Sequence, residues 1–298
     1  ICILGPLLAR LHKAVVSLPG GCVIGARPID LHLKGLAALG AKVKIEEGYV
    51  HVTADKLKGT DLFLGGRSGP TVLGTDNVMM AAVLAEGVTI IESAACEPEV
   101  IDLANFLNAM GAKIEGAGTR RIVVEGVKEL HGVEHAVIPD RIEAGTFVLL
   151  AAMARSNFVI RDIDYHQLTA LDDVLSHIGV RVEAEKNLAR VKAPKTLKPF
   201  SITTYPYPGF PTDLQAQYTA IMALTNGMSV IRDTVFPDRF MHIAELNRMG
   251  ARIRRESGCA IVEGVKELGG TIVTASDLRA SAALVMAGLV ANGTTEIR

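Results

Sequence analysis

A unit of about 70 residues recurs four times in this sequence, and the repetition limits the folds open to the chain. Each copy ends a helical stretch at a glycine and continues into a short strand. The steps between these glycines are 71, 68 and 71 positions, and the residues are Gly40, Gly111, Gly179 and Gly250. The segment Glu-Gly-Val-Lys-Glu-Leu also occurs twice, at 125–130 and at 263–268. Such a period indicates one structural unit used repeatedly.

Each unit is expected to combine a small sheet with an amphipathic helix. In the second copy, the apolar residues of 98–110 lie near helical spacing, with a proline at the start and Gly111 as the C-terminal cap. Runs rich in β-branched residues lie on either side of this helix. The strands of this copy are predicted at 88–91, 113–115, 121–125 and 134–138.

A second helix in each unit is apolar nearly all round, which is typical of a buried helix. These helices are predicted at 77–85, 141–154, 214–224 and 278–291. Each begins after an aspartate that can cap the exposed backbone N–H groups and complement the helix dipole. The four aspartates are Asp76, Asp140, Asp213 and Asp277. A small mixed sheet around buried helices predicts an α/β class that differs from the usual one, in which helices cover the sheet.

Composition bounds the size and the setting of the protein. The 298 residues suggest two domains of about 150 residues each. The formal net charge of −1 provides no overall field that would attract nucleic acid or an anionic membrane, and no apolar run reaches the ~18 residues that span a bilayer. The four cysteines are widely spaced without a CxxC pair, which argues against a structural zinc site and against a disulfide framework. These features favour a reduced, cytoplasmic protein.

The most reactive stretch predicted from the sequence is the loop at 18–32, which holds three glycines and one cysteine. The glycines let the backbone bend and approach a ligand closely. Cys22 lies at the centre of this loop. A free thiol has a pKa of about 8.5, so it can donate a proton near neutrality, whereas the neighbouring Arg27 would favour a nucleophilic thiolate. The alternative is a tight turn that happens to contain a cysteine.

The loop sequence Pro-Gly-Gly-Cys-Val-Ile-Gly-Ala-Arg-Pro-Ile-Asp-Leu-His at 19–32 resembles the active-site loop of the UDP-N-acetylglucosamine enolpyruvyl transferases. Other stretches resemble the same family over nearly the whole chain, at 46–50, 84–87, 139–143, 210–213, 239–242 and 277–281. The resemblance implies two inside-out α/β barrel domains, each of three such units and incomplete here. It places the cysteine loop in a domain at 1–138 and a catalytic aspartate in a domain at 139–298.

The resemblance also implies a reaction. Enzymes of this family move the enolpyruvyl group of phosphoenolpyruvate to the 3′-hydroxyl of UDP-N-acetylglucosamine and release phosphate, by addition and then elimination, as the first committed step of peptidoglycan synthesis. No metal and no organic cofactor is implied. The expected partners are these two small substrates, without nucleic acid or membrane, and the oligomeric state is left open.

Particular residues of this chain match the catalytic positions of the family. Cys22 is expected to protonate the methylene carbon of phosphoenolpyruvate, and Asp213 to accept the proton of the sugar hydroxyl. From the repeat alone Asp213 is a helix cap, so only the resemblance assigns it this role. Arg27 is expected to serve both catalysis and binding.

The expected substrate contacts extend from the cysteine loop to the second half of the chain. They are Arg27, Pro28, Ile29, Asp30, Leu31, Asp213, Val235, Arg239 and Arg279. For Ile29, Leu31 and Val235 the alternative is core packing. For Arg279, which lies in the first turn of a predicted buried helix, the alternatives are an anion at the helix start and an ion pair with a neighbouring acid.

Two other interpretations stay open. The same fold could belong to a 3-phosphoshikimate 1-carboxyvinyltransferase, although that relative resembles the loop at 19–32 poorly. The chain could also be an inactive nucleotide-sugar binder, because it is expected to be a fragment. The family uses a Lys-Asn pair and further arginines at positions that lie outside these 298 residues.

Overall fold

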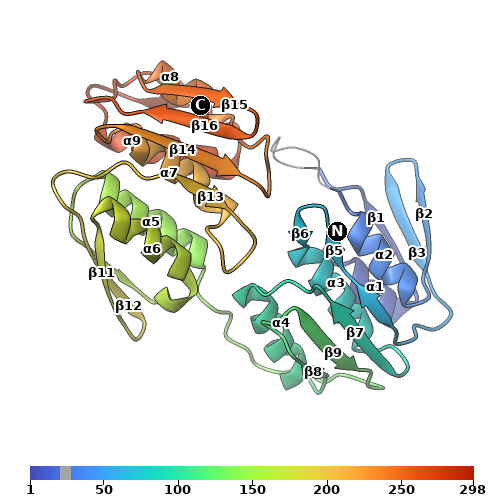
Figure 1. The fold of residues 1–298 in the computed structure, drawn as a ribbon. Coiled ribbons are helices and arrows are strands. Elements are labelled where there is room, and N and C mark those ends of the chain that lie inside the picture. The colour runs from blue at the N-terminus through green and yellow to red at the C-terminus, as the bar shows by residue number, and fades with distance from the viewer. Residues whose placement is uncertain (21–27) are drawn as a thin grey trace. The chain divides into compact units, whose positions relative to one another are not determined.

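The computed structural model describes residues 1–20 and 28–298 of the chain, so the predicted roles of Cys22 and Arg27 fall outside the described residues. Contacts divide the chain into two compact units, which meet in the sequence between Ile138 and Pro139 (Figure 1). Each unit has its own apolar core. Among the described residues, no helix has the length and apolar character needed to cross a membrane.

The first unit holds two copies of the repeat. Its helices are α1 (Leu4–Leu11), α2 (Asp30–Ala38), α3 (Val72–Ala82) and α4 (Pro98–Ala109). Its strands are β1 (Lys13–Ser17), β2 (Lys42–Glu46), β3 (Tyr49–Thr53), β4 (Asp61–Phe63), β5 (Gly65–Gly66), β6 (Gly69–Pro70), β7 (Val88–Glu92), β8 (Lys113–Glu115) and β9 (Arg121–Glu125). The strands form sheets in the orders β1-β3-β2 and β4-β7-β9-β8, and β5 pairs with β6. Helix α3 packs against α1, α2 and α4.

The second unit holds the other two copies. Its helices are α5 (Arg141–Met153), α6 (Thr169–Ile178), α7 (Gln215–Met222), α8 (His242–Arg248) and α9 (Leu278–Val290), with 3-10 turns η1 (Tyr165–Leu168) and η2 (Thr212–Leu214). Its strands are β10 (Phe158–Arg161), β11 (Arg181–Glu185), β12 (Leu188–Lys192), β13 (Ile202–Thr204), β14 (Met228–Asp233), β15 (Arg252–Glu256), β16 (Cys259–Glu263), β17 (Ile272–Val273) and β18 (Glu296–Ile297). The sheet orders are β10-β12-β11, β13-β14-β16-β15 and β17-β18.

The predicted repeat is confirmed by the backbone at its four glycines. Gly40, Gly111, Gly179 and Gly250 have φ angles of 99°, 102°, 94° and 95°. This left-handed conformation is accessible to glycine without the steric cost that other residues incur, so each glycine ends its helix and turns the chain into a hairpin. The hairpins that follow are β2–β3, β8–β9, β11–β12 and β15–β16. Copies two and four also share an added parallel strand, β4 or β13.

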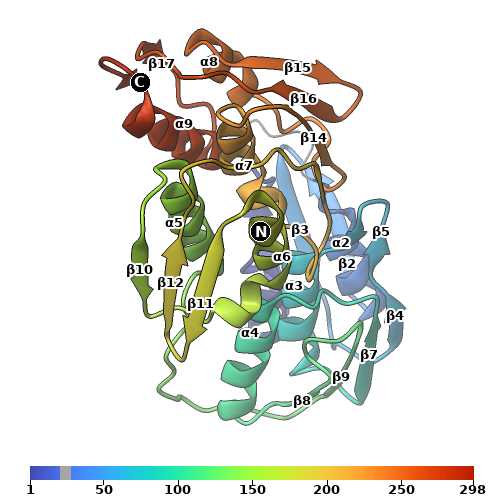
Figure 2. The same ribbon diagram turned by 60° about the vertical axis from the view of Figure 1, so that its left-hand side comes forward.

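The predicted α/β class with buried central helices is confirmed. In the second unit α5, α7 and α9 pack against one another, and Figure 2 shows them between the sheets of that unit. All eight residues of α7 are buried, including two glutamines and a threonine. The all-round apolar character of these helices in the sequence reflects this central position.

Three predictions of local structure are wrong. Asp213 lies inside η2 and caps no helix, because neither η2 nor α7 has a side-chain cap. The segment 134–138 forms no strand. Val137 is 78% exposed, so this stretch has no buried apolar face that could hold it against a sheet. Helix α3 begins at Val72, with the hydroxyl of Thr71 accepting a hydrogen bond from the Gly74 amide at 3.2 Å, so Asp76 lies inside the helix and does not cap it.

Candidate functional site

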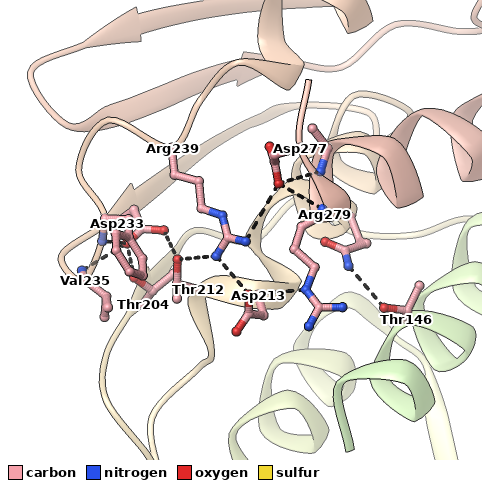
Figure 3. A network of polar contacts seen from close by, with 12 residues as sticks. Thr146, Thr204, Thr212, Asp213, Asp233, Val235, Arg239, Asp277 and Arg279 are labelled. Carbon is pink, nitrogen blue, oxygen red and sulfur yellow. Dashed lines mark hydrogen bonds and ion pairs between the residues drawn. The ribbon is translucent and has the colours of Figure 1, made fainter. Parts of the chain in front are cut away.

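Asp213 lies in the 3-10 turn η2, immediately before the buried helix α7. Its Oδ1 forms an ion pair with Arg239 Nη1 at 3.0 Å and accepts a hydrogen bond from Arg279 Nε at 3.2 Å (Figure 3). Its other oxygen, Oδ2, accepts no hydrogen bond from the described residues, and the side chain is 39% exposed. Two guanidinium groups therefore fix the carboxylate through one oxygen and leave the second oxygen available to a ligand.

Arg239 is the buried member of this group, with 7% of its side chain exposed. Besides Asp213, its Nη1 donates to the hydroxyl of Thr212 at 3.3 Å, and its Nη2 lies 3.8 Å from Asp277 Oδ1. The guanidinium also lies over the ring of Phe236, 5.7 Å from the centroid. Because a buried cation requires compensating partners, these contacts hold Arg239 in one orientation.

One carboxylate oxygen of Asp277 both caps α9 and lies within ion-pair distance of Arg239. Its Oδ1 caps α9 by accepting from the amides of Arg279 at 2.9 Å and of Ala280 at 3.3 Å, as the repeat predicts. The same oxygen faces Arg239, a contact between residues 38 positions apart that no local sequence signal marks. The cap thereby places Arg279 in the first turn of α9, where its side chain reaches Asp213.

Arg279 forms the ion pair that was one of its two expected alternatives, although its partner is distant in the sequence. Only its Nε is engaged, and its two Nη atoms contact no acceptor within the described part of the chain. The side chain is 22% exposed. The outer edge of this guanidinium can therefore also bind an anion, since its planar fork matches a phosphate or a carboxylate.

The remaining predicted contacts divide between the two units. Pro28 and Ile29 precede α2, and Asp30 and Leu31 form its first turn. Ile29 and Leu31 pack against the core of the first unit, as their alternative interpretation expected. Val235 belongs to the second unit and follows β14, with its amide donating to Asp233 Oδ1 at 3.0 Å.

The one histidine beside these arginines is uncharged near neutrality. His242 begins α8 and is 1% exposed. Burial lowers the pKa of its imidazole to about 4; the charge of Asp277 partly opposes this effect, and the charge of Arg239 adds to it. The positive charge in this group therefore comes from the two arginines. No cluster of potential metal ligands was found among residues 1–20 and 28–298.

Sequence reasoning missed two side chains that connect this site. Thr212 donates to Asp233 Oδ2 at 2.7 Å and accepts from Arg239, and Asp233 is 2% exposed. The only signal for Thr212 was its position beside Asp213. Asp233 ends a strand that carried no motif, so nothing local in the sequence marked it.

In the second unit, two arginines thus fix a carboxylate beside the central helices and leave its second oxygen open. A family model described as EPSP synthase (3-phosphoshikimate 1-carboxyvinyltransferase) matches residues 1–298. The chain therefore belongs to the EPSP synthase family of enolpyruvyl transferases. The predicted resemblance of the chain to the UDP-N-acetylglucosamine enolpyruvyl transferases is confirmed.

Several individual proteins of the family are similar to this chain along its whole length. The UDP-N-acetylglucosamine 1-carboxyvinyltransferase of Akkermansia muciniphila is 57% identical over 300 residues, covering 100% of this chain and 71% of that protein. UDP-N-acetylglucosamine 1-carboxyvinyltransferase 2 of Carboxydothermus hydrogenoformans is 56% identical, covering 99% and 70%. Among solved structures, the enolpyruvyl transferase NikO from Streptomyces tendae has a TM-score of 0.88 at 26% identity, over 100% of this chain and 71% of that chain. An EPSP synthase from Acinetobacter baumannii, at TM-score 0.73 and 22% identity, shares the fold.

Proposed function

We propose that this protein transfers the enolpyruvyl group of phosphoenolpyruvate to the 3′-hydroxyl of UDP-N-acetylglucosamine, releasing phosphate in the first committed step of peptidoglycan synthesis. The observation that carries the proposal is identity of 53–57% along the whole chain to proteins named for this reaction. The Asp213 carboxylate, with one oxygen held by arginines and the other open, suits the proton transfer that the reaction needs.

The chemistry assigned to these residues has two steps. In the addition, the 3′-oxygen of the sugar bonds to C2 of phosphoenolpyruvate, Asp213 takes the proton of the hydroxyl, and Cys22 gives a proton to C3. In the elimination, the Cys22 thiolate takes a proton back from C3, the double bond between C2 and C3 re-forms, and phosphate leaves with the proton that Asp213 had accepted. The residues at 27–31 are assigned to the uridine nucleotide and to phosphoenolpyruvate, and Val235 to the nucleotide sugar. Arg239 and Arg279 are assigned to anionic parts of the substrates. No cofactor takes part in either step.

The proposal extends to the domains and the location. Residues 1–138 are assigned as an enolpyruvyl transferase domain that carries the cysteine loop, and 139–298 as one that carries Asp213. A cytoplasmic location is proposed because both substrates are phosphorylated metabolites. The absence of disulfides at Cys2, Cys96 and Cys259 supports it.

The acceptor test uses the protein expressed from its full reading frame with phosphoenolpyruvate and one of two acceptors. We expect phosphate release with UDP-N-acetylglucosamine and none with shikimate 3-phosphate. Release with shikimate 3-phosphate alone would assign the chain to the other branch of the family. Calorimetric binding of UDP-N-acetylglucosamine without phosphate release would show a nucleotide-sugar binder.

Alkylation tests the role of Cys22. We expect the epoxide fosfomycin to add one molecule, found by peptide mass spectrometry at Cys22. Cys96 is the matched control, because burial, followed by the charge of Glu97, raises the pKa of its thiol and so disfavours the reactive thiolate. Cys96→Ala should leave labelling and turnover unchanged, whereas Cys22→Ala should abolish labelling and lower kcat about 100-fold or more. Labelling at any other cysteine, or full activity of Cys22→Ala, would overturn the assignment.

A further inference from the structure

Asp233 is a buried carboxylate to which the proposed mechanism assigns no task. It is the last residue of β14 and is 2% exposed. It has no ion pair with any described residue, yet burying a carboxylate is costly unless it is well hydrogen-bonded. Four neutral donors provide this compensation, two hydroxyls and two backbone amides.

The four hydrogen bonds divide between the two oxygens of the Asp233 carboxylate. Oδ1 accepts from the Thr204 hydroxyl at 2.9 Å and from the amides of Val235 and Phe236 at 3.0 Å and 2.7 Å. Oδ2 accepts from the Thr212 hydroxyl at 2.7 Å (Figure 3). One oxygen thus fixes the turn after β14, and the other fixes the residue beside Asp213.

Each of the two oxygens binds a residue that in turn contacts Arg239. The Thr212 hydroxyl donates a hydrogen bond to Asp233, so its oxygen lone pairs face Arg239 Nη1, which donates to that oxygen at 3.3 Å. Phe236, whose amide is bound by Asp233, places its ring against the same guanidinium. Arg239 in turn holds Asp213 Oδ1 at 3.0 Å. A chain of directed contacts therefore runs from Asp233 to the carboxylate assigned as proton acceptor.

We propose that Asp233 is a positioning residue of the reaction, which sets the direction of the Thr212 hydroxyl and thereby the orientation of Arg239 against Asp213. This inference rests on the proposed function and adds a residue to it. Asp233 also positions Val235, the predicted nucleotide-sugar contact, because the same carboxylate accepts from the Val235 amide.

Substitutions at Thr212 provide the sharpest test. Thr212→Ser keeps the hydroxyl and should keep kcat within threefold of the wild type. Thr212→Val keeps the shape but removes the hydroxyl, and should lower kcat by about 10- to 100-fold, because a misplaced catalytic group costs this much. Asp233→Asn should act alike, since its amide group would donate to Thr212 and reverse the hydrogen bond. The double variant Asp233→Asn/Thr212→Val should be no slower than the slower single variant, because both act through one chain of contacts.

Thr204→Val is the matched structural control. It removes another hydroxyl from the same carboxylate, at 2.9 Å; this hydroxyl accepts from the Thr234 amide at 3.2 Å and, unlike that of Thr212, does not accept from Arg239. We expect a lower melting temperature and a kcat within threefold of the wild type. Equal losses of kcat in Thr204→Val and Thr212→Val would show that Asp233 only supports the fold, and would overturn the proposal.

A second readout is independent of turnover. The ¹⁵Nε signal of Arg239 should broaden or shift in Thr212→Val and stay in place in Thr212→Ser. If the wild type transfers no enolpyruvyl group while the Arg239 signal responds in this way, the proposed function fails and the positioning contact stands. If the wild type is active and neither kcat nor the Arg239 signal distinguishes the two variants, the positioning role is wrong.

Discussion

Asp213→Asn is expected to lower kcat about 100- to 10,000-fold, the range over which a positioned general base accelerates a reaction. Asparagine keeps the shape of the side chain, and its amide oxygen can still lie against Arg239 and accept from Arg279. It cannot take the proton of the sugar hydroxyl. Steady-state kinetics with UDP-N-acetylglucosamine should therefore show the loss in kcat, with a smaller change in KM.

Asp140→Asn is the matched control for this prediction. Asp140 stands at the start of α5, the repeat position that corresponds to Asp213, and acts as a plain helix cap. Its Oδ1 accepts from the amides of Ile142 at 2.8 Å and Glu143 at 3.1 Å. Asparagine caps a helix about as well as aspartate, so kcat and stability should change little. A kcat of Asp213→Asn within threefold of the wild type would remove Asp213 from the mechanism.

The repeat could be predicted from the sequence because its signals are local. A glycine at the end of a helix is required by the left-handed backbone at that position, and the four φ angles meet this requirement. The caps at Asp140 and Asp277 were predicted for the same reason, since the bonds they form reach only two or three residues along the chain.

The site could not be predicted in this way, because its contacts are between distant residues. Asp213 looks like the other cap candidates in the sequence, and it differs through its ion pairs with Arg239 and with Arg279, 66 positions away. Only the family resemblance singled it out. The chain of contacts through Thr212 and Asp233 had no such guide, since it depends on strands β13 and β14 ending side by side.

Asp76 shows how a repeat can mislead. The repeat assigned it to a helix start, but the first turn of α3 is formed one turn earlier, where Thr71 supplies the cap. Asp76 is consequently placed inside a packed helix, close enough to Glu97 and Glu99 to be affected by their charges. A position that favours a charge in the other copies disfavours it here, and this difference has a measurable consequence for stability.

Asp76→Asn is expected to raise the free energy of unfolding of the first unit above pH 7 by on the order of 2–4 kcal/mol. Burial, followed by the charges of Glu97 and Glu99, raises the pKa of the Asp76 carboxyl to about 7. Its Oδ1 is buried and accepts no hydrogen bond from the described residues. Asparagine has the same shape and no charge, so the cost of ionising this group inside the protein disappears.

The pH dependence of the difference between the two proteins identifies the cause. The unfolded carboxyl titrates near its ordinary pKa of 3.8 and the folded one near 7, so between these values the folded state holds a proton that the unfolded state has lost. Wild-type stability therefore falls as the pH rises through this window. The two proteins should be about equally stable near pH 4, and the advantage of asparagine should grow until about pH 7 and then level off.

Urea unfolding followed by circular dichroism between pH 4 and pH 8 measures this difference, and hydrogen exchange of the α3 amides at pH 8 assigns it to the first unit. Asp61→Asn is the control, because Asp61 is an exposed residue of β4 and its replacement should change stability by less than about 0.5 kcal/mol at every pH. An Asp76→Asn protein whose advantage is the same at pH 5 and pH 8, or that is less stable than the wild type at pH 8, would show that the ionised carboxylate is stabilised by contacts of its own and that burial does not dominate its energetics.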